Sequence, residues 1–92
     1  MELNFTKIGN SYVAEFQAPG NFNLHVETDT ACSVGVFQRT ASSGAFAPVE
    51  VGGSKNFGKV IDIDFTGAVW PKTVQVHVPY QPTKAEVTTS AQ

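Results

Sequence analysis

The sequence contains little cysteine and little charge. Cys32 is the only cysteine among 92 residues, so no internal disulfide can form and a disulfide-stapled secreted scaffold is excluded. Charged residues make up 15% of the chain, whereas an average soluble domain has about 25%. A surface with so few charges suits a protein that stays bound to neighbouring proteins.

Basic residues are scarce and scattered. They are Lys7, Arg39, Lys55, Lys59, Lys72 and Lys84. Binding to nucleic acid requires several basic side chains on one face, and the formal net charge here is −2. The same scatter argues against an anionic membrane surface. We therefore expect neither nucleic acid nor membrane among the partners.

Long hydrophobic runs are also missing. No stretch approaches the roughly 18 apolar residues of a membrane span. The first ten residues, MELNFTKIGN, have neither a basic lead nor an apolar stretch, so no signal peptide is predicted. We expect the chain to be made in the cytoplasm without an export route of its own. Cys32 lies in the apolar-leaning run ACSVGVF, where it is expected to pack as a small hydrophobe.

Helical periodicity is absent, while alternation with a period of two recurs along the whole chain. In FNLHVE, for example, apolar residues alternate with Asn23, His25 and Glu27. Four such segments supply the predicted core. Its residues are Tyr12, Ala14, Phe16, Phe22, Leu24, Val26, Ile61, Ile63, Phe65, Val74, Val76 and Val78.

Turn signals separate the alternating segments. Gly9-Asn10 suits a two-residue hairpin turn, and Pro19-Gly20 suits the centre of a type II turn. We predict strands at 2–8, 11–18, 22–28, 32–39, 45–51, 58–65 and 72–79, with an eighth near 83–88. This spacing predicts an all-β fold: one antiparallel β-sandwich, Ig-like or jelly-roll-like, of seven to eight short strands. The domain would span 1–88, followed by a flexible tail at 89–92.

Two aspartates and two histidines are the candidates for a polar site. Asp62 and Asp64 point to one side of their strand, about 7 Å apart. His77 would lie near them if its strand pairs with theirs, and His25 belongs to an earlier strand. Together they could hold a divalent metal. Each of the four also occupies a polar position of a strand in which apolar and polar residues alternate. We therefore predict that all four face solvent and that no metal or cofactor is bound.

Catalytic arrangements are not evident. Two carboxylates on an open strand face lack the separate environments that a working acid–base pair requires. The serines occur in no nucleophile-elbow motif, and Cys32 has no electropositive neighbour within reach along its strand. We therefore predict that the chain is not an enzyme and has no catalytic residues.

A few residues outside the predicted core are candidates for binding another molecule. They are Arg39, Phe46, Phe57 and Trp70. Aromatic residues and arginine supply much of the binding energy at protein interfaces. Exposed rings would equally serve a sugar-binding platform, and Trp70 could instead lie flat over one end of the sandwich. The sequence leaves these alternatives open.

The pattern YVAEF, NFNLHVE, FQRT and WPKTVQVHV resembles small structural proteins of tailed phages that infect gut Bacteroidetes, including the crAss-like group. The resemblance covers most of positions 2–88, and Trp70-Pro71-Lys72 is its most distinctive element. It implies an auxiliary capsid, or head-decoration, protein that is made in the bacterial cytoplasm and resides in the virion. A capsid protein would then be the partner.

Taken together, these features predict a non-enzymatic interaction module that packs onto a larger protein assembly, and the resemblance implies that this assembly is a phage particle. Homo-oligomerisation is compatible with this role. Many weakly bound copies on a lattice can hold firmly without a tight individual contact. The alternative is a β-sandwich that binds a carbohydrate or another ligand.

Overall fold

The structure is a computed structural model and describes residues 1–18, 20–40, 45–49, 56–66 and 72–89. These residues form eight β-strands, which confirms the all-β prediction. The strands are β1 (Thr6–Ile8), β2 (Ser11–Ala18), β3 (Phe22–Cys32), β4 (Gly35–Thr40), β5 (Ala47–Val49), β6 (Gly58–Phe65), β7 (Lys72–Val78) and β8 (Lys84–Thr89). No helix in this part of the chain is long and apolar enough to cross a membrane.

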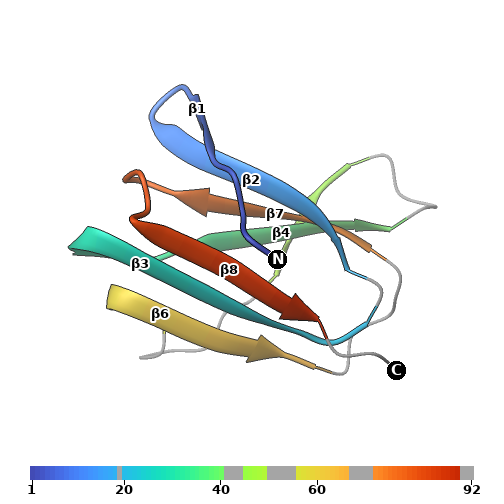
Figure 1. The fold of residues 1–92 in the computed structure, drawn as a ribbon. Helices are drawn as coiled ribbons and strands as arrows, with labels where there is room; N and C mark the ends of the chain where they lie inside the picture. The colour runs from blue at the N-terminus through green and yellow to red at the C-terminus, as the bar shows by residue number, and fades with distance from the viewer. Residues whose placement is uncertain (19, 41–44, 50–55, 67–71, 90–92) are drawn as a thin grey trace.

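The strands form two antiparallel sheets that pack as a sandwich (Figure 1). One sheet has the order β1-β2-β7-β4-β5, and the other has the order β6-β3-β8. The chain changes sheet between β2 and β3 and again between β3 and β4. It also changes sheet at each step from β5 to β8. Consequently β6 and β7, which are neighbours in sequence, lie in different layers.

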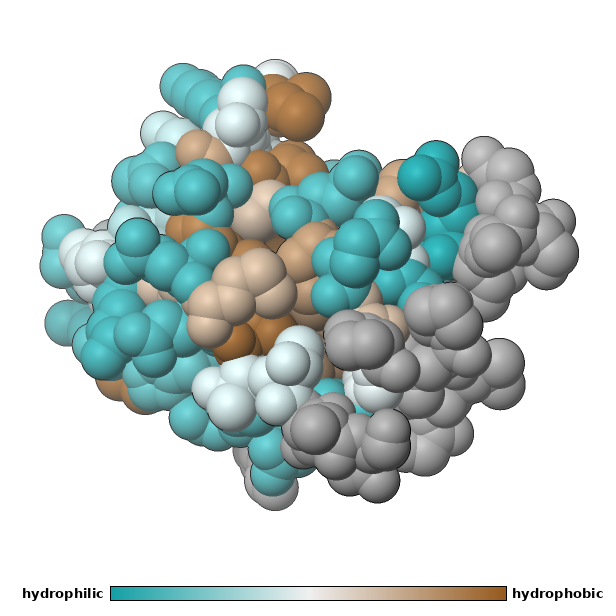
Figure 2. Space-filling view, turned by 45° about the vertical axis from the view of Figure 1, so that its right-hand side comes forward, coloured by the Kyte–Doolittle hydropathy of each residue, from teal (hydrophilic) through white to brown (hydrophobic). Residues whose placement is uncertain are grey.

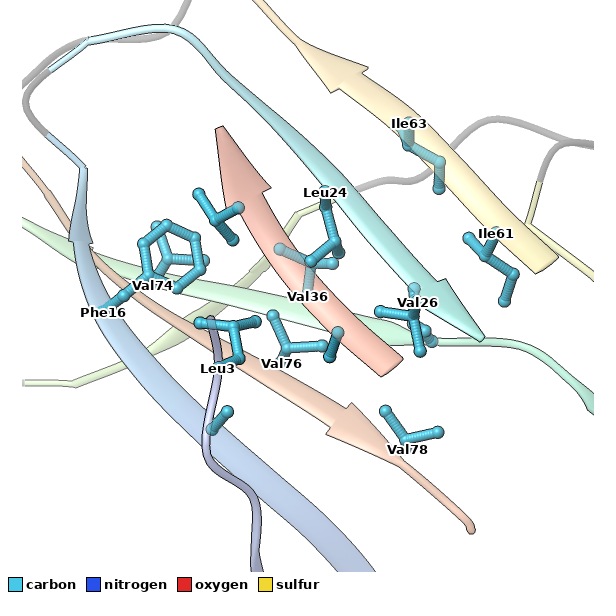
Figure 3. Packing of buried hydrophobic residues seen from close by; sticks show 14 of the residues in the cluster. Leu3, Phe16, Leu24, Val26, Val36, Ile61, Ile63, Val74, Val76 and Val78 are labelled. Carbon is cyan, nitrogen blue, oxygen red and sulfur yellow. The ribbon is translucent and has the colours of Figure 1, made fainter. Parts of the chain in front are cut away.

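The core lies between the sheets. Figure 3 shows Val76 of β7 and Leu24 and Val26 of β3 directed into this space. All the predicted core residues are buried except Tyr12 and Phe65, which are half-buried. The Phe65 ring stacks on Phe22 with ring centroids 4.7 Å apart. Cys32 is 5% exposed within the same cluster, as expected for a small hydrophobe.

The N-terminal segment departs from the predicted strand 2–8. Only Thr6–Ile8 pairs with β2, whereas residues 1–3 lie along the outer edge of β8. There the Leu3 N–H donates to the Ala85 carbonyl at 3.0 Å, and the Val87 N–H donates to the Met1 carbonyl at 2.7 Å. Leu3 is buried in the core. The segment thus begins on one sheet and crosses to the other, closing one side of the sandwich.

Other strand boundaries differ by smaller amounts. β3 continues four residues beyond its predicted end at 28, through a register shift against β6 between Glu27 and Cys32. β8 begins at Lys84 and ends at Thr89, while the rest of the expected tail, 90–92, is outside the described residues. In the turn between β1 and β2, Gly9 has φ 63°, while no described non-glycine residue has positive φ. This pattern fits a type II′ turn, in which only the first central residue needs positive φ. Pro19 of the other predicted turn is not among the described residues.

Leu24 and Val60 provide a matched test of the layer assignment. Leu24 is fully buried on the central strand β3, so Leu24→Ala should lower the free energy of unfolding by about 3 kcal/mol. Val60, with 58% of its surface exposed on β6, should lose at most about 0.5 kcal/mol in Val60→Ala. Urea unfolding of both variants measures the difference. Equal losses would contradict the assignment of Leu24 to the interior and Val60 to the surface.

Candidate functional site

The outer face of the three-stranded sheet carries a cluster of ionisable side chains. Its register places His25 of β3 between Asp62 of β6 and Glu86 of β8. Two residues before His25 on β3, Asn23 lies opposite Asp64 of β6. Two residues after His25, Glu27 lies on the same face of β3. We call this surface the acidic face. It comprises Asn23, His25, Glu27, Asp62, Asp64, Lys84 and Glu86.

His25 is held between two carboxylates. Its Nδ1 lies 2.8 Å from Oδ2 of Asp62, and its Nε2 lies 2.7 Å from Oε2 of Glu27. A neutral imidazole has only one N–H, so both contacts are hydrogen bonds only when the ring is protonated. The hydrogen bond with Glu27, followed by that with Asp62, raises the pKa of His25 above 6.5. The geometry therefore favours a charged imidazolium on this face.

Asn23 holds the two aspartates. Its Nδ2 donates to Oδ1 of Asp62 at 2.6 Å and to Oδ1 of Asp64 at 2.9 Å. Hydrogen bonds from Asn23 and then from His25 lower the pKa of Asp62 below 3.8, because they stabilise the carboxylate. The donors of these bonds belong to β3. Both β6 carboxylates are thus bonded toward the middle of the sheet, away from its margin.

His77 lies away from this cluster. Because β7 belongs to the other sheet, pairing of its strand with β6, on which the four-residue metal hypothesis depended, does not occur. The Nε2 of His77 is 3.1 Å from Oε1 of Gln75, and its ring meets Phe37 edge-on. Within the described ranges, no group of three or more His, Cys, Asp or Glu residues is arranged to hold a metal ion. Asp62 and Asp64 are exposed, which confirms their assignment to the solvent side.

The predicted interaction residues fall at separate places. The guanidinium carbon of Arg39 lies 4.8 Å from the ring centre of Phe46, a cation–π contact between two half-buried side chains. Phe57 is 65% exposed and follows Asn56, whose side chain bonds the main chain of Val34, the residue before β4. Arg39 is near the other end of β4, so Phe57 and Arg39 do not form one patch. Trp70 lies outside the described residues.

The outer edge of β6 is the longest unpaired strand edge in the described part of the structure. Figure 1 shows β6 at the margin of its sheet. The opposite margin, β8, is partly covered by residues 1–3. In the other sheet the marginal strands β1 and β5 have three residues each, and β5 contains Pro48. β6 has eight residues and no proline, so it offers a continuous row of backbone donors and acceptors.

Exposed hydrophobic side chains accompany this edge. The large hydrophobic residues with high exposure are Met1, Ile8, Phe57, Val60 and Tyr80. Figure 2 shows hydrophobic surface across the middle of one face and at the top of the molecule, bordered by hydrophilic side chains. Of the five residues, Phe57 and Val60 adjoin the β6 edge. Val60 was not among the predicted interaction residues. It lies on the same face of β6 as Asp62 and Asp64, and it is the apolar residue of the three.

Comparison of the chain with protein-family models, with curated proteins and with solved structures finds no significant match. The fold itself defines the class: a small all-β protein of two packed antiparallel sheets with five and three strands. Its notable surface features are the acidic face and the outer edge of β6, which no described residue covers.

The acidic face should give His25 a measurable pH dependence. A raised pKa means that its contribution to stability is complete below pH 6.5 and is lost as the pH rises through the folded-state pKa. Asp62→Asn should therefore bring the pKa of His25, followed by NMR, back toward 6.5. It should lower the free energy of unfolding at pH 6 by only about 0.5 kcal/mol, since the pair is largely solvent-exposed.

Glu15→Gln is the matched control, because Glu15 is an exposed acid on the other sheet. It should leave the pKa of His25 unchanged. The contacts would be contradicted if His25 titrated at or below 6.5 in the unmodified protein, or if both variants shifted it equally.

Proposed function

We propose that the chain is a non-enzymatic structural module that binds a larger protein assembly through the edge of β6. The observation that supports this is an eight-residue strand whose outer edge has no partner among the described residues, with Phe57 and Val60 exposed beside it. Addition of a strand to a sheet edge is a general mode of protein recognition, in which main-chain hydrogen bonds give affinity and alternate side chains give specificity. Val60 and Phe57 would be the apolar contacts.

The charges of β6 do not close its edge to a partner strand. Exposed edge strands are commonly protected from unwanted pairing by charged side chains, and β6 carries Lys59, Asp62 and Asp64. The two aspartates, however, are hydrogen-bonded to side chains of β3. Their negative charge is compensated in part by the imidazolium of His25. The edge therefore stays accessible to a partner strand while the surface keeps its polar character.

The particle of a tailed phage is the assembly that we propose. This part of the proposal depends on the sequence resemblance to structural proteins of phages of gut Bacteroidetes. The chain would be an auxiliary capsid protein, bound in many copies to the head. Repetition suits an edge contact of limited size, because multivalent attachment compensates for a weak individual contact. The sugar-binding alternative needs Phe57 and Trp70 beside one concave polar patch, and no described contact favours it.

A reconstitution experiment tests the proposal. Heads are purified from a phage that lacks the gene for this chain, and the purified protein is added back before sedimentation through a sucrose cushion. The unmodified protein should sediment with the heads. Val60→Glu places a charge on the edge and should reduce the bound amount about tenfold, the effect of losing about 1.4 kcal/mol.

Thr6→Glu is the control variant, because it adds the same charge at an exposed position of the other sheet. It should bind as the unmodified protein does. If the unmodified protein stays in the supernatant, the chain is not a head-binding module. If Val60→Glu binds as well as Thr6→Glu, the β6 edge is not the binding surface.

A further inference from the structure

We propose that the β6 edge binds the β6 edge of a second copy of this chain, antiparallel across a two-fold axis, with Val60 opposite Val60. This inference rests on the proposed function and names its immediate partner. The two three-stranded sheets would join into one continuous sheet of six strands. In such a dimer the strand added to each β6 edge comes from the neighbouring copy, and the larger assembly would take up the dimer as a bivalent unit through other surfaces.

The geometry of antiparallel pairing limits the possible registers. In a two-fold pair the two sheets keep the same face outward, and directly opposite residues lie on the same face. The two-fold axis must therefore pass between one residue of β6 and the same residue of the second copy. The central part of β6 offers four such positions: Val60, Ile61, Asp62 and Ile63.

Charge excludes two of these registers. With the axis at Asp62, that residue faces its own copy directly. With the axis at Ile63, Asp62 faces Asp64 of the second copy. Like charges directly opposite each other on neighbouring strands are destabilising. The two registers toward the start of β6 avoid both contacts.

The register centred on Val60 makes the better use of the exposed side chains. Val60, which is 58% exposed in the single chain, lies against its own copy. Asp62 then lies opposite Gly58, which has no side chain to crowd the carboxylate. With the axis at Ile61, by contrast, Asp62 would lie directly opposite Val60 and each valine would lose its apolar neighbour.

The acidic face should make this pairing sensitive to pH. Each copy contributes Glu27 from β3, Asp62 and Asp64 from β6, and Glu86 with Lys84 from β8. His25 lies among these groups and bonds two of the carboxylates. While its imidazole is protonated, it offsets part of the negative charge that the two copies bring together. Loss of that proton at higher pH should weaken the dimer.

Cysteine crosslinking tests the register. In Val60→Cys the two new thiols lie directly opposite each other, within the reach of a disulfide, so mild oxidation should give a covalent dimer. In Asp62→Cys the thiols are displaced by four residues, about 13 Å along the strand, which is too far for a disulfide. The native Cys32 is 5% exposed and should not react in the folded protein.

Sedimentation equilibrium of the unlinked proteins supplies the second measurement. We expect the unmodified chain to dimerise, Val60→Glu to raise the dimer Kd about tenfold or more, and Thr6→Glu to leave it unchanged. The Kd should also rise between pH 6 and pH 8, and less so in His25→Gln.

A monomeric protein, or a covalent dimer from Asp62→Cys as efficient as that from Val60→Cys, would overturn the inference. These results remain distinct from failure of the proposed function. A monomer whose Val60→Glu variant still loses head binding would show that the edge pairs with a capsid protein instead. If the protein dimerises but does not sediment with heads, the inferred dimer is supported and the head-binding role is contradicted.

Discussion

The structure depends on the packing of alternate side chains between two sheets. In β3, the central strand of its sheet, Leu24 and Val26 point inward while Asn23 and His25 point outward. This alternation fixes the register, because a shift by one residue would move every buried side chain to the solvent. The same constraint places the ionisable residues of β3 and β6 side by side on the outside. The core and the acidic face are therefore two consequences of one pattern.

The two edges of the three-stranded sheet differ in how far the chain itself covers them. The N-terminal segment covers much of β8 and anchors itself through Leu3, so one side is closed by the chain's own backbone. β6 has no such cover among the described residues. A small domain buries a limited fraction of its surface, and an uncovered edge with apolar neighbours is the place where additional burial is most easily gained. The proposals for β6 follow from this asymmetry.

Hydrogen bonding on the acidic face moderates what would otherwise be strong repulsion. Asn23 and His25 supply the donors that Asp62 and Asp64 need, and His25 contributes a positive charge when protonated. Exposed ion pairs add little to stability. Their main effect here is to hold the β6 carboxylates over the sheet, toward β3.

The sequence by itself determined the all-β class, the position of most strands and the larger part of the core, because side-chain direction in a strand repeats every two residues. It did not identify Val36, Ala85 or Val87 as core residues, although all three are buried. It also placed Asp62 and Asp64 on the solvent side. It did not determine which strands pair, since pairing depends on contacts between segments far apart in the chain. Only the tertiary structure decided that His25 meets Asp62 while His77 lies in the other sheet. It also decided that residues 1–3 cover part of β8, and that Val60 lies on a marginal strand whose outer edge no described residue covers.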